Sequence, residues 1–80
     1  MKNILLSGLP VGVDEAQVQT WFHEEGDAVR EGDEIVEFLA GDVVHIVVAP
    51  FGGILSEVYY DEGETVERDD VICAIDDEAE

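Results

Sequence analysis

The side chains that could take part in chemistry are few and lie far apart in the sequence. His45 could be a pH-sensitive group or a ligand, but His23 is the only other histidine and nothing in the pattern brings their segments together. We therefore expect His45 to be a satisfied structural residue. Cys73, the single cysteine, lies in an apolar run without a neighbouring base that would lower its pKa, which favours a buried thiol over a nucleophile. The sequence pairs no nucleophile with a base and contains no set of residues with metal-ligand spacing. We therefore expect neither catalysis nor a metal site in this chain.

The remaining reactive groups are carboxylates, 21 Asp and Glu against 3 Lys and Arg, for a net charge of −18. Strings of acids at 61–64 and 69–70 offer the oxygen ligands that calcium prefers, but they lack the alternating spacing that ends in a bidentate glutamate. The alternative is a solvated, charged edge that discourages sheets from aggregating. We favour this second interpretation.

The net charge also restricts the partners. Three basic residues cannot neutralise a phosphate backbone, and an anionic bilayer would repel the chain, so we expect neither nucleic acid nor a membrane as partner. No stretch approaches a membrane span or a secretory signal, which makes a cytoplasmic location the expectation. Because 46% of the residues are hydrophobic, the chain should fold despite its charge.

The elements that would position these side chains are strands. Apolar residues recur mostly at a period of two, and glycine–acid turns break the chain into short pieces, which is typical of a small all-β sandwich or barrel. The alternation is blurred at Ile35, Val36, Phe38 and Leu39. A short helix opening at Asp14 is the one alternative, and its apolar face is too thin to support it.

The sequence contains an internal repeat. Without a gap, residues 18–39 lie on residues 55–76, with five identical pairs among 22. Each copy has an apolar strand, an acid-acid-glycine turn, a valine, and an Asp and Ile that open the next strand. The repeat predicts two similar halves related by a pseudo-two-fold axis, joined by residues 40–54. The identical pairs are Glu25/Glu62, Gly26/Gly63, Val29/Val66, Asp33/Asp70 and Ile35/Ile72.

In this order the motifs resemble those of the lipoyl domain family, the swinging-arm carriers of the acyltransferase component in 2-oxo acid dehydrogenase complexes, which is related to biotinyl carrier domains. The resemblance covers about Leu9 to Ile75. It implies a flattened barrel or sandwich of two four-stranded antiparallel sheets, with the hairpin at 41–42 at one end and both termini at the other. The motifs lie at 13–21, 25–29, 32–33, 49–55 and 61–66.

The family attaches lipoate to a lysine at the tip of the hairpin between the halves, and that position falls on Asp42. An amide bond to lipoate or biotin requires an amine, which a carboxylate cannot supply. Lys2, the single lysine, would lie at the opposite end of such a fold. We therefore expect no cofactor. Asp42 itself could also be an ordinary turn residue.

Further departures from the family surround this position. Leu39 stands where glutamate is typical, Gly41 also differs from the motif, and Ile46 and Val48 occupy positions that are usually polar. Strand alternation puts Ile46 and Val48 on one face, and His45 and Val47 on the other. We expect a surface for a protein partner formed by Leu39, Gly41, Asp42, Ile46 and Val48.

The leading hypothesis is a lipoyl-like domain over residues 1–76, followed by an acidic tail or linker at 77–80, which recognises dehydrogenase-complex components or a ligase without carrying lipoate. The chain could be a fragment or a stand-alone relic. Simultaneous changes at Leu39 and Gly41 favour natural divergence over an engineered loss of the lysine. The alternative function is a structural or adaptor module of the same fold with no role in acyl transfer.

Overall fold

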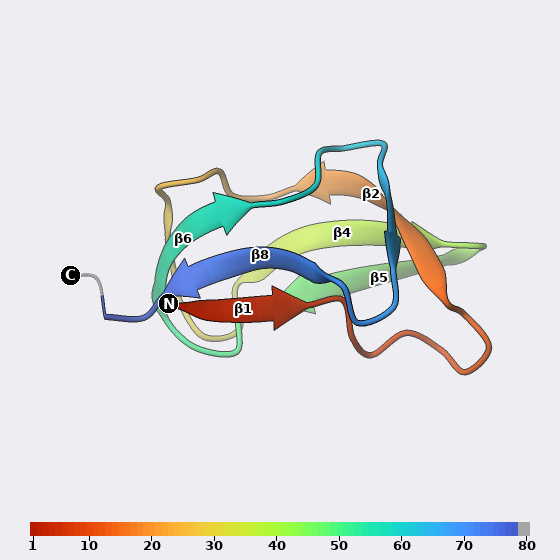
Figure 1. Cartoon of the computed structure of the whole chain (residues 1–80), viewed down its shortest axis with the longest axis horizontal. Helices are drawn as coiled ribbons and strands as arrows, with labels where there is room; N and C mark the ends of the chain where they lie inside the picture. The colour runs from red at the N-terminus through yellow and green to blue at the C-terminus, as the bar shows by residue number, and fades with distance from the viewer. Residues whose placement is uncertain (79–80) are drawn as a thin grey trace.

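The protein is an elongated all-β molecule, described here from a computed structural model over residues 1–78, with extents of 38 × 21 × 17 Å. Figure 1 shows the hairpin between β4 and β5 at one end and the N-terminus at the other, with the chain near residue 78 also at that far end. The alternative of a short helix beginning at Asp14 is wrong, because strand β2 begins at the next residue, Glu15. The strands are β1 (Lys2–Leu5), β2 (Glu15–Trp21), β3 (Ala28–Val29), β4 (Glu34–Ala40), β5 (Val43–Val48), β6 (Gly53–Val58), β7 (Thr65–Glu67) and β8 (Val71–Asp76).

The strands form two four-stranded antiparallel sheets. One has the order β1-β8-β6-β3 and the other β5-β4-β2-β7. Moving along the chain by one repeat exchanges β2 with β6, β3 with β7 and β4 with β8, so the two orders are equivalent and β5 corresponds to β1. The expected fold class and the pseudo-two-fold arrangement are both confirmed.

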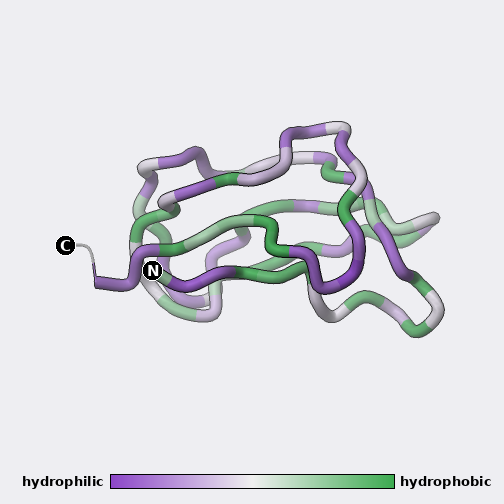
Figure 2. Tube along the Cα trace, in the orientation of Figure 1, coloured by the Kyte–Doolittle hydropathy of each residue, from purple (hydrophilic) through white to green (hydrophobic). Residues whose placement is uncertain are grey.

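Hydrogen bonds reproduce the repeat between the halves. The Gly26 N–H donates to the Leu55 carbonyl at 2.7 Å, and the Gly63 N–H donates to the Val18 carbonyl at 2.8 Å. Each bond joins a turn of one half to a strand of the other. The turns at 24–27 and 61–64 lie on the same side of the molecule, and both are hydrophilic (Figure 2).

The core lies between the sheets and contains no charged or polar side chain among the described residues. Burial of its aliphatic side chains supplies the main driving force for folding. Ile35 and Val36 are both fully buried although they are adjacent, because the pairing of β4 with β5 shifts register between Glu34 and Val36. This bulge explains the blurred alternation in the sequence. The largest fully buried side chains are Phe38, Leu6, Ile35, Leu55, Ile72 and Ile75.

The domain limit at residue 76 coincides with the end of β8 at Asp76. The acidic tail predicted for 77–80 extends past the described residues, because 79 and 80 lie outside them. Its structural character stays a prediction.

Candidate functional site

The tip of the β4–β5 hairpin is a two-residue turn closed by the pair Ala40 and Val43. Gly41 has a φ of 64°, and Asp42 is not among the residues with positive φ. A positive φ at the first central position is the pattern of a type II′ turn, in which glycine is preferred at that position. Asp42 is exposed at the end of the molecule that lies farthest from the N-terminus (Figure 1).

The hairpin presents an outer apolar face made of Leu39, Val44, Ile46 and Val48. Leu39 is paired with Val44 across the hairpin. Val44 is 57% exposed, Val48 47% and Leu39 36%, whereas Ile46 is partly buried. The burial pattern follows the predicted alternation at Val47, which is buried between the partly buried Ile46 and the exposed Val48. Nearer the tip the pattern departs from it, because His45 and Ile46 are both partly buried and Val43 is exposed. Val44 was missed by the sequence prediction, although the same period of two identifies it.

Acids border this face. Glu37 is paired with Ile46, and Glu34 with Val48, so two carboxylates stand on β4 beside the apolar row of β5. Asp42 closes the row at the tip. The surface therefore combines aliphatic side chains with acidic residues at its border, and neither strand contains a lysine or an arginine.

His45 is a satisfied structural residue, as expected. Its Nε2 atom lies 2.7 Å from the Ser7 carbonyl, to which the ring can donate only through an N–H at that nitrogen. The bond ties the middle of β5 to the segment that follows β1. The two histidines lie on separate elements, since His23 instead has Nδ1 3.7 Å from an Asp27 carboxylate oxygen.

Cys73 is fully buried in β8, as predicted. Burial raises the pKa of its thiol to about 12, because the apolar surroundings disfavour the thiolate. Burial and the raised pKa both disfavour the thiolate, which is the nucleophilic form.

The acid strings act within the turns. The Glu24 N–H donates to an Asp27 carboxylate oxygen at 2.8 Å, and the Asp61 N–H donates to a Glu64 carboxylate oxygen at 2.6 Å. Each carboxylate thus satisfies the backbone of its own turn. Over residues 1–78, no group of three or more His, Cys, Asp or Glu side chains could hold a metal ion.

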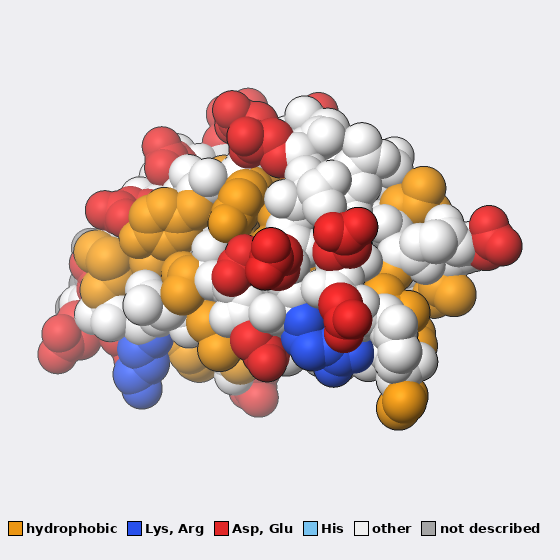
Figure 3. All heavy atoms as spheres, turned by 45° about the vertical axis from the view of Figure 1, so that its right-hand side comes forward, with side chains coloured by type: hydrophobic (Ala, Val, Ile, Leu, Met, Phe, Trp, Pro, Cys, Tyr) orange, Lys and Arg blue, Asp and Glu red, His pale blue; other side chains and the backbone are white. Residues whose placement is uncertain are grey.

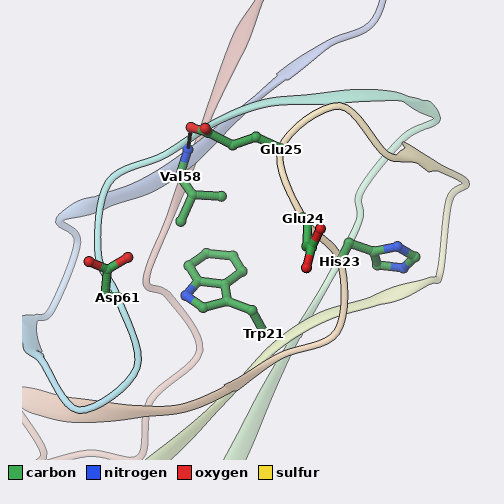
Figure 4. Close-up of a pocket in the computed structure, with 6 residues that line it drawn as sticks. All are labelled: Trp21, His23, Glu24, Glu25, Val58 and Asp61. Carbon is green, nitrogen blue, oxygen red and sulfur yellow. Dashed lines mark hydrogen bonds between the residues drawn. The ribbon is translucent and has the colours of Figure 1, made fainter.

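A shallow cleft of about 400 Å³ lies beside Trp21, remote from the hairpin tip. In Figure 4 the indole lies between Asp61 and Glu24, while the His23 ring points away from it. The indole Nε1–H donates to the Tyr60 carbonyl at 2.8 Å, so this polar atom is already satisfied. Residues from both repeats line the cleft, and its lining contains no nucleophile paired with a base. Its lining residues are Trp21, His23, Glu24, Glu25, Val58 and Asp61.

Lys2 lies on β1, away from the hairpin tip, as the sequence predicted. Its Nζ atom is 3.5 Å from an Asp77 carboxylate oxygen and 5.4 Å from the centre of the Phe51 ring. Acidic side chains are spread over the face shown in Figure 3, where few basic ones are visible. Over residues 1–78, the structure has no helix long and apolar enough to cross a bilayer.

Comparison with known proteins identifies the family to which this fold belongs. The model of the biotin and lipoyl family, described as "Biotin-requiring enzyme", matches residues 4–75. The chain belongs to this family.

Its curated relatives include succinyltransferase components of 2-oxoglutarate dehydrogenase complexes. One from Haemophilus influenzae is 44% identical over 63 residues, covering 79% of this chain and 15% of the relative. One from Cupriavidus necator is 37% identical over 71 residues, covering 89% of this chain and 17% of the relative. The chain thus spans less than a fifth of the length of these relatives.

A solved structure shows the same fold. The lipoyl domain of the 2-oxoglutarate dehydrogenase complex from Azotobacter vinelandii superposes with a TM-score of 0.77 and 27% identity, covering 94% of this chain and 95% of that domain. The expected relationship to lipoyl domains of dehydrogenase acyltransferase components is confirmed.

Proposed function

We propose that this chain is a non-catalytic carrier-fold domain that remains unmodified at the hairpin tip and acts through protein recognition. The observation that carries the proposal is the carboxylate of Asp42 at the exposed tip, together with the position of the single lysine, Lys2, on a strand at the other end. Lipoate, when bound to a lysine, supplies a mobile dithiolane; Asp42 offers no nitrogen to hold it.

The recognition surface consists of Leu39, Gly41, Asp42, Ile46 and Val48, with Val44 added by the structure. The aliphatic members are exposed or partly buried on one face, and contiguous exposed apolar surface is typical of protein contacts. The relatives belong to 2-oxoglutarate dehydrogenase complexes, so components of such a complex, or a ligase that acts on such domains, are the partners we propose.

The test is the intact mass of the chain after co-expression with lipoate and biotin ligases. We expect no adduct on the parent chain and a lipoyl adduct on Asp42→Lys, because the variant restores an amine at the tip. Asp42→Arg is the matched control. It adds the same charge as lysine, but its guanidinium group stays protonated and is not an amine that a ligase can acylate. Adding Lys2→Arg to Asp42→Lys should leave the adduct in place.

An adduct on the parent chain would overturn the unmodified state. If Asp42→Lys also stays unmodified, the tip no longer presents the surface that a ligase recognises, and the ligase is removed from the proposed partners.

The outer apolar face also favours a second candidate function, an adaptor module with no role in acyl transfer. Binding to the purified dehydrogenase component of a 2-oxoglutarate dehydrogenase complex separates the two candidates. Saturable binding that is lost in Ile46→Glu supports the first, and absence of binding supports the adaptor.

A further inference from the structure

The β5 strand is an open sheet edge without the features that usually protect one. Among the described residues it pairs only with β4. Its sequence from Val43 to Val48 has five aliphatic residues and His45, with no proline and no acidic, lysine or arginine side chain. Exposed edges normally carry charges or proline, or are very short, because unpaired N–H and C=O groups invite another strand.

The other three edges of the two sheets are protected. β3 has two residues, and β7 has three, one of them Glu67. β1, which corresponds to β5 in the pseudo-two-fold arrangement, carries Lys2. Of the four edge strands, β5 is therefore the longest, and it carries no acidic, lysine or arginine side chain.

Backbone groups on the free side of β5 have no hydrogen-bond partner among the described residues. Ala40 and Val43 close the two-residue turn as a hydrogen-bonded pair, so the alternation of an antiparallel ladder turns the N–H and C=O of Val44 and Ile46 away from β4. Over residues 1–78, no turn or loop backbone bond reaches residues 43–48. The segment that follows β1 contacts β5 through a hydrogen bond between the His45 side chain and the Ser7 carbonyl. This bond does not use the backbone N–H or C=O groups of Val44 and Ile46.

We propose that β5 binds an extended, basic polypeptide segment by strand addition. This deepens the recognition role proposed above and rests on it. Main-chain hydrogen bonds to Val44 and Ile46 would supply affinity, and aliphatic side chains of the added strand would extend the outer apolar face.

Charge selects the occupant. The whole chain has a net charge of −18. Glu34 and Glu37 lie on β4, one strand away from the open edge, and Asp42 lies at the hairpin tip. A second copy would bring an equal negative charge to the same edge, whereas lysines or arginines beside the apolar residues of a segment would be attracted to it. A strand with alternating apolar and basic residues puts its apolar side chains on the outer face. Its basic side chains lie on the opposite face and are attracted by the net charge of the whole chain.

The probe is a fluorescent peptide of alternating valine and lysine, about as long as β5, titrated against the whole chain. We expect saturable binding that weakens as salt is added, and slower hydrogen exchange at the Val44 and Ile46 amides. Two further peptides carry N-methyl groups on alternate backbone nitrogens, one on each of the two alternate sets. Methylation of the set that faces β5 should weaken binding at least tenfold, because it removes the hydrogen bonds to β5 without changing the charge.

Ile46→Lys should also weaken binding at least tenfold, since it places a charge on the edge as naturally protected edges do. Val11→Lys is the matched control: this valine is fully exposed in the segment between β1 and β2, and its replacement adds the same charge while leaving affinity unchanged.

Three results would overturn strand addition of a basic segment. The first is absence of binding, and the second is equal affinity for the unmethylated peptide and both methylated peptides. The third is equal affinity for a peptide in which glutamate replaces lysine. A dimer of the parent chain that Ile46→Lys dissociates would show that a second copy is the occupant, and would also overturn it. A lipoyl adduct on the parent chain overturns the unmodified state instead, and does not change the peptide titration.

Discussion

Single positions determine what the hairpin tip can present. Gly41 supplies the positive φ that the type II′ turn requires, whereas Asp42 occupies the second central position without positive φ. The turn geometry therefore depends on Gly41 and accepts many residues at 42. This is why Asp42→Lys is expected to fold, and why the chemistry of the tip can change without a change in the hairpin.

Cys73 gives a prediction at the same scale. Burial raises the pKa of this thiol from 9.0 to about 12, so at pH 9 the folded protein holds it almost entirely protonated. Because the thiolate is the reactive form, alkylation by iodoacetamide at pH 9 should be at least about a hundredfold slower in the folded protein than in guanidinium. Equal rates in the two solvents would contradict the buried thiol.

The strands and turns show how far the sequence could predict the structure. The repeat predicted equivalent halves because the same turn residues recur in the same order, and the period of two predicted the face of Ile46 and Val48. Bonds between the halves, such as that from the Trp21 N–H to a Glu62 carboxylate oxygen, could not be predicted. They depend on how two strands distant in sequence meet, which periodicity does not determine.

The start of β6 gives a prediction for an element. A Cβ atom on Gly53 would lie 2.5 Å from the Asp76 carbonyl oxygen, where β6 meets β8. Gly53→Ala should therefore destabilise the protein by about 1–3 kcal/mol, the usual cost of overpacking. The neighbouring Gly52→Ala is the matched control, because its nearest contact would be an ordinary 3.5 Å.

Urea unfolding of both variants measures this difference. Equal midpoints for Gly53→Ala and Gly52→Ala would show that β6 and β8 can separate at this point without cost, which contradicts the close approach.

At the scale of the whole molecule, fold and charge make different demands on the same chain. The apolar core draws the two sheets together, while 21 acidic residues against 3 basic ones repel each other over a molecule only 38 Å long. Salt bridges relieve little of this repulsion, since those of Lys2 and Arg68 are exposed or long. The sequence predicts the net charge completely, but only the structure shows how closely the charges are confined.

Salt should therefore stabilise the protein. The screening length is about 30 Å at 0.01 M salt and about 10 Å at 0.1 M, so carboxylates interact across most of the molecule in the first case and mainly with near neighbours in the second. We expect the melting temperature to rise by several degrees over this range, equally in sodium and potassium chloride, since about 1 kcal/mol shifts it by about 4–8 °C in a domain of this size.

Asp42→Lys changes the net charge from −18 to −16, so this variant should melt at a higher temperature than the parent at low salt. The difference between the two melting temperatures should decrease as salt is added. A melting temperature that is flat or falls with salt would mean that self-repulsion does not limit the stability of this domain.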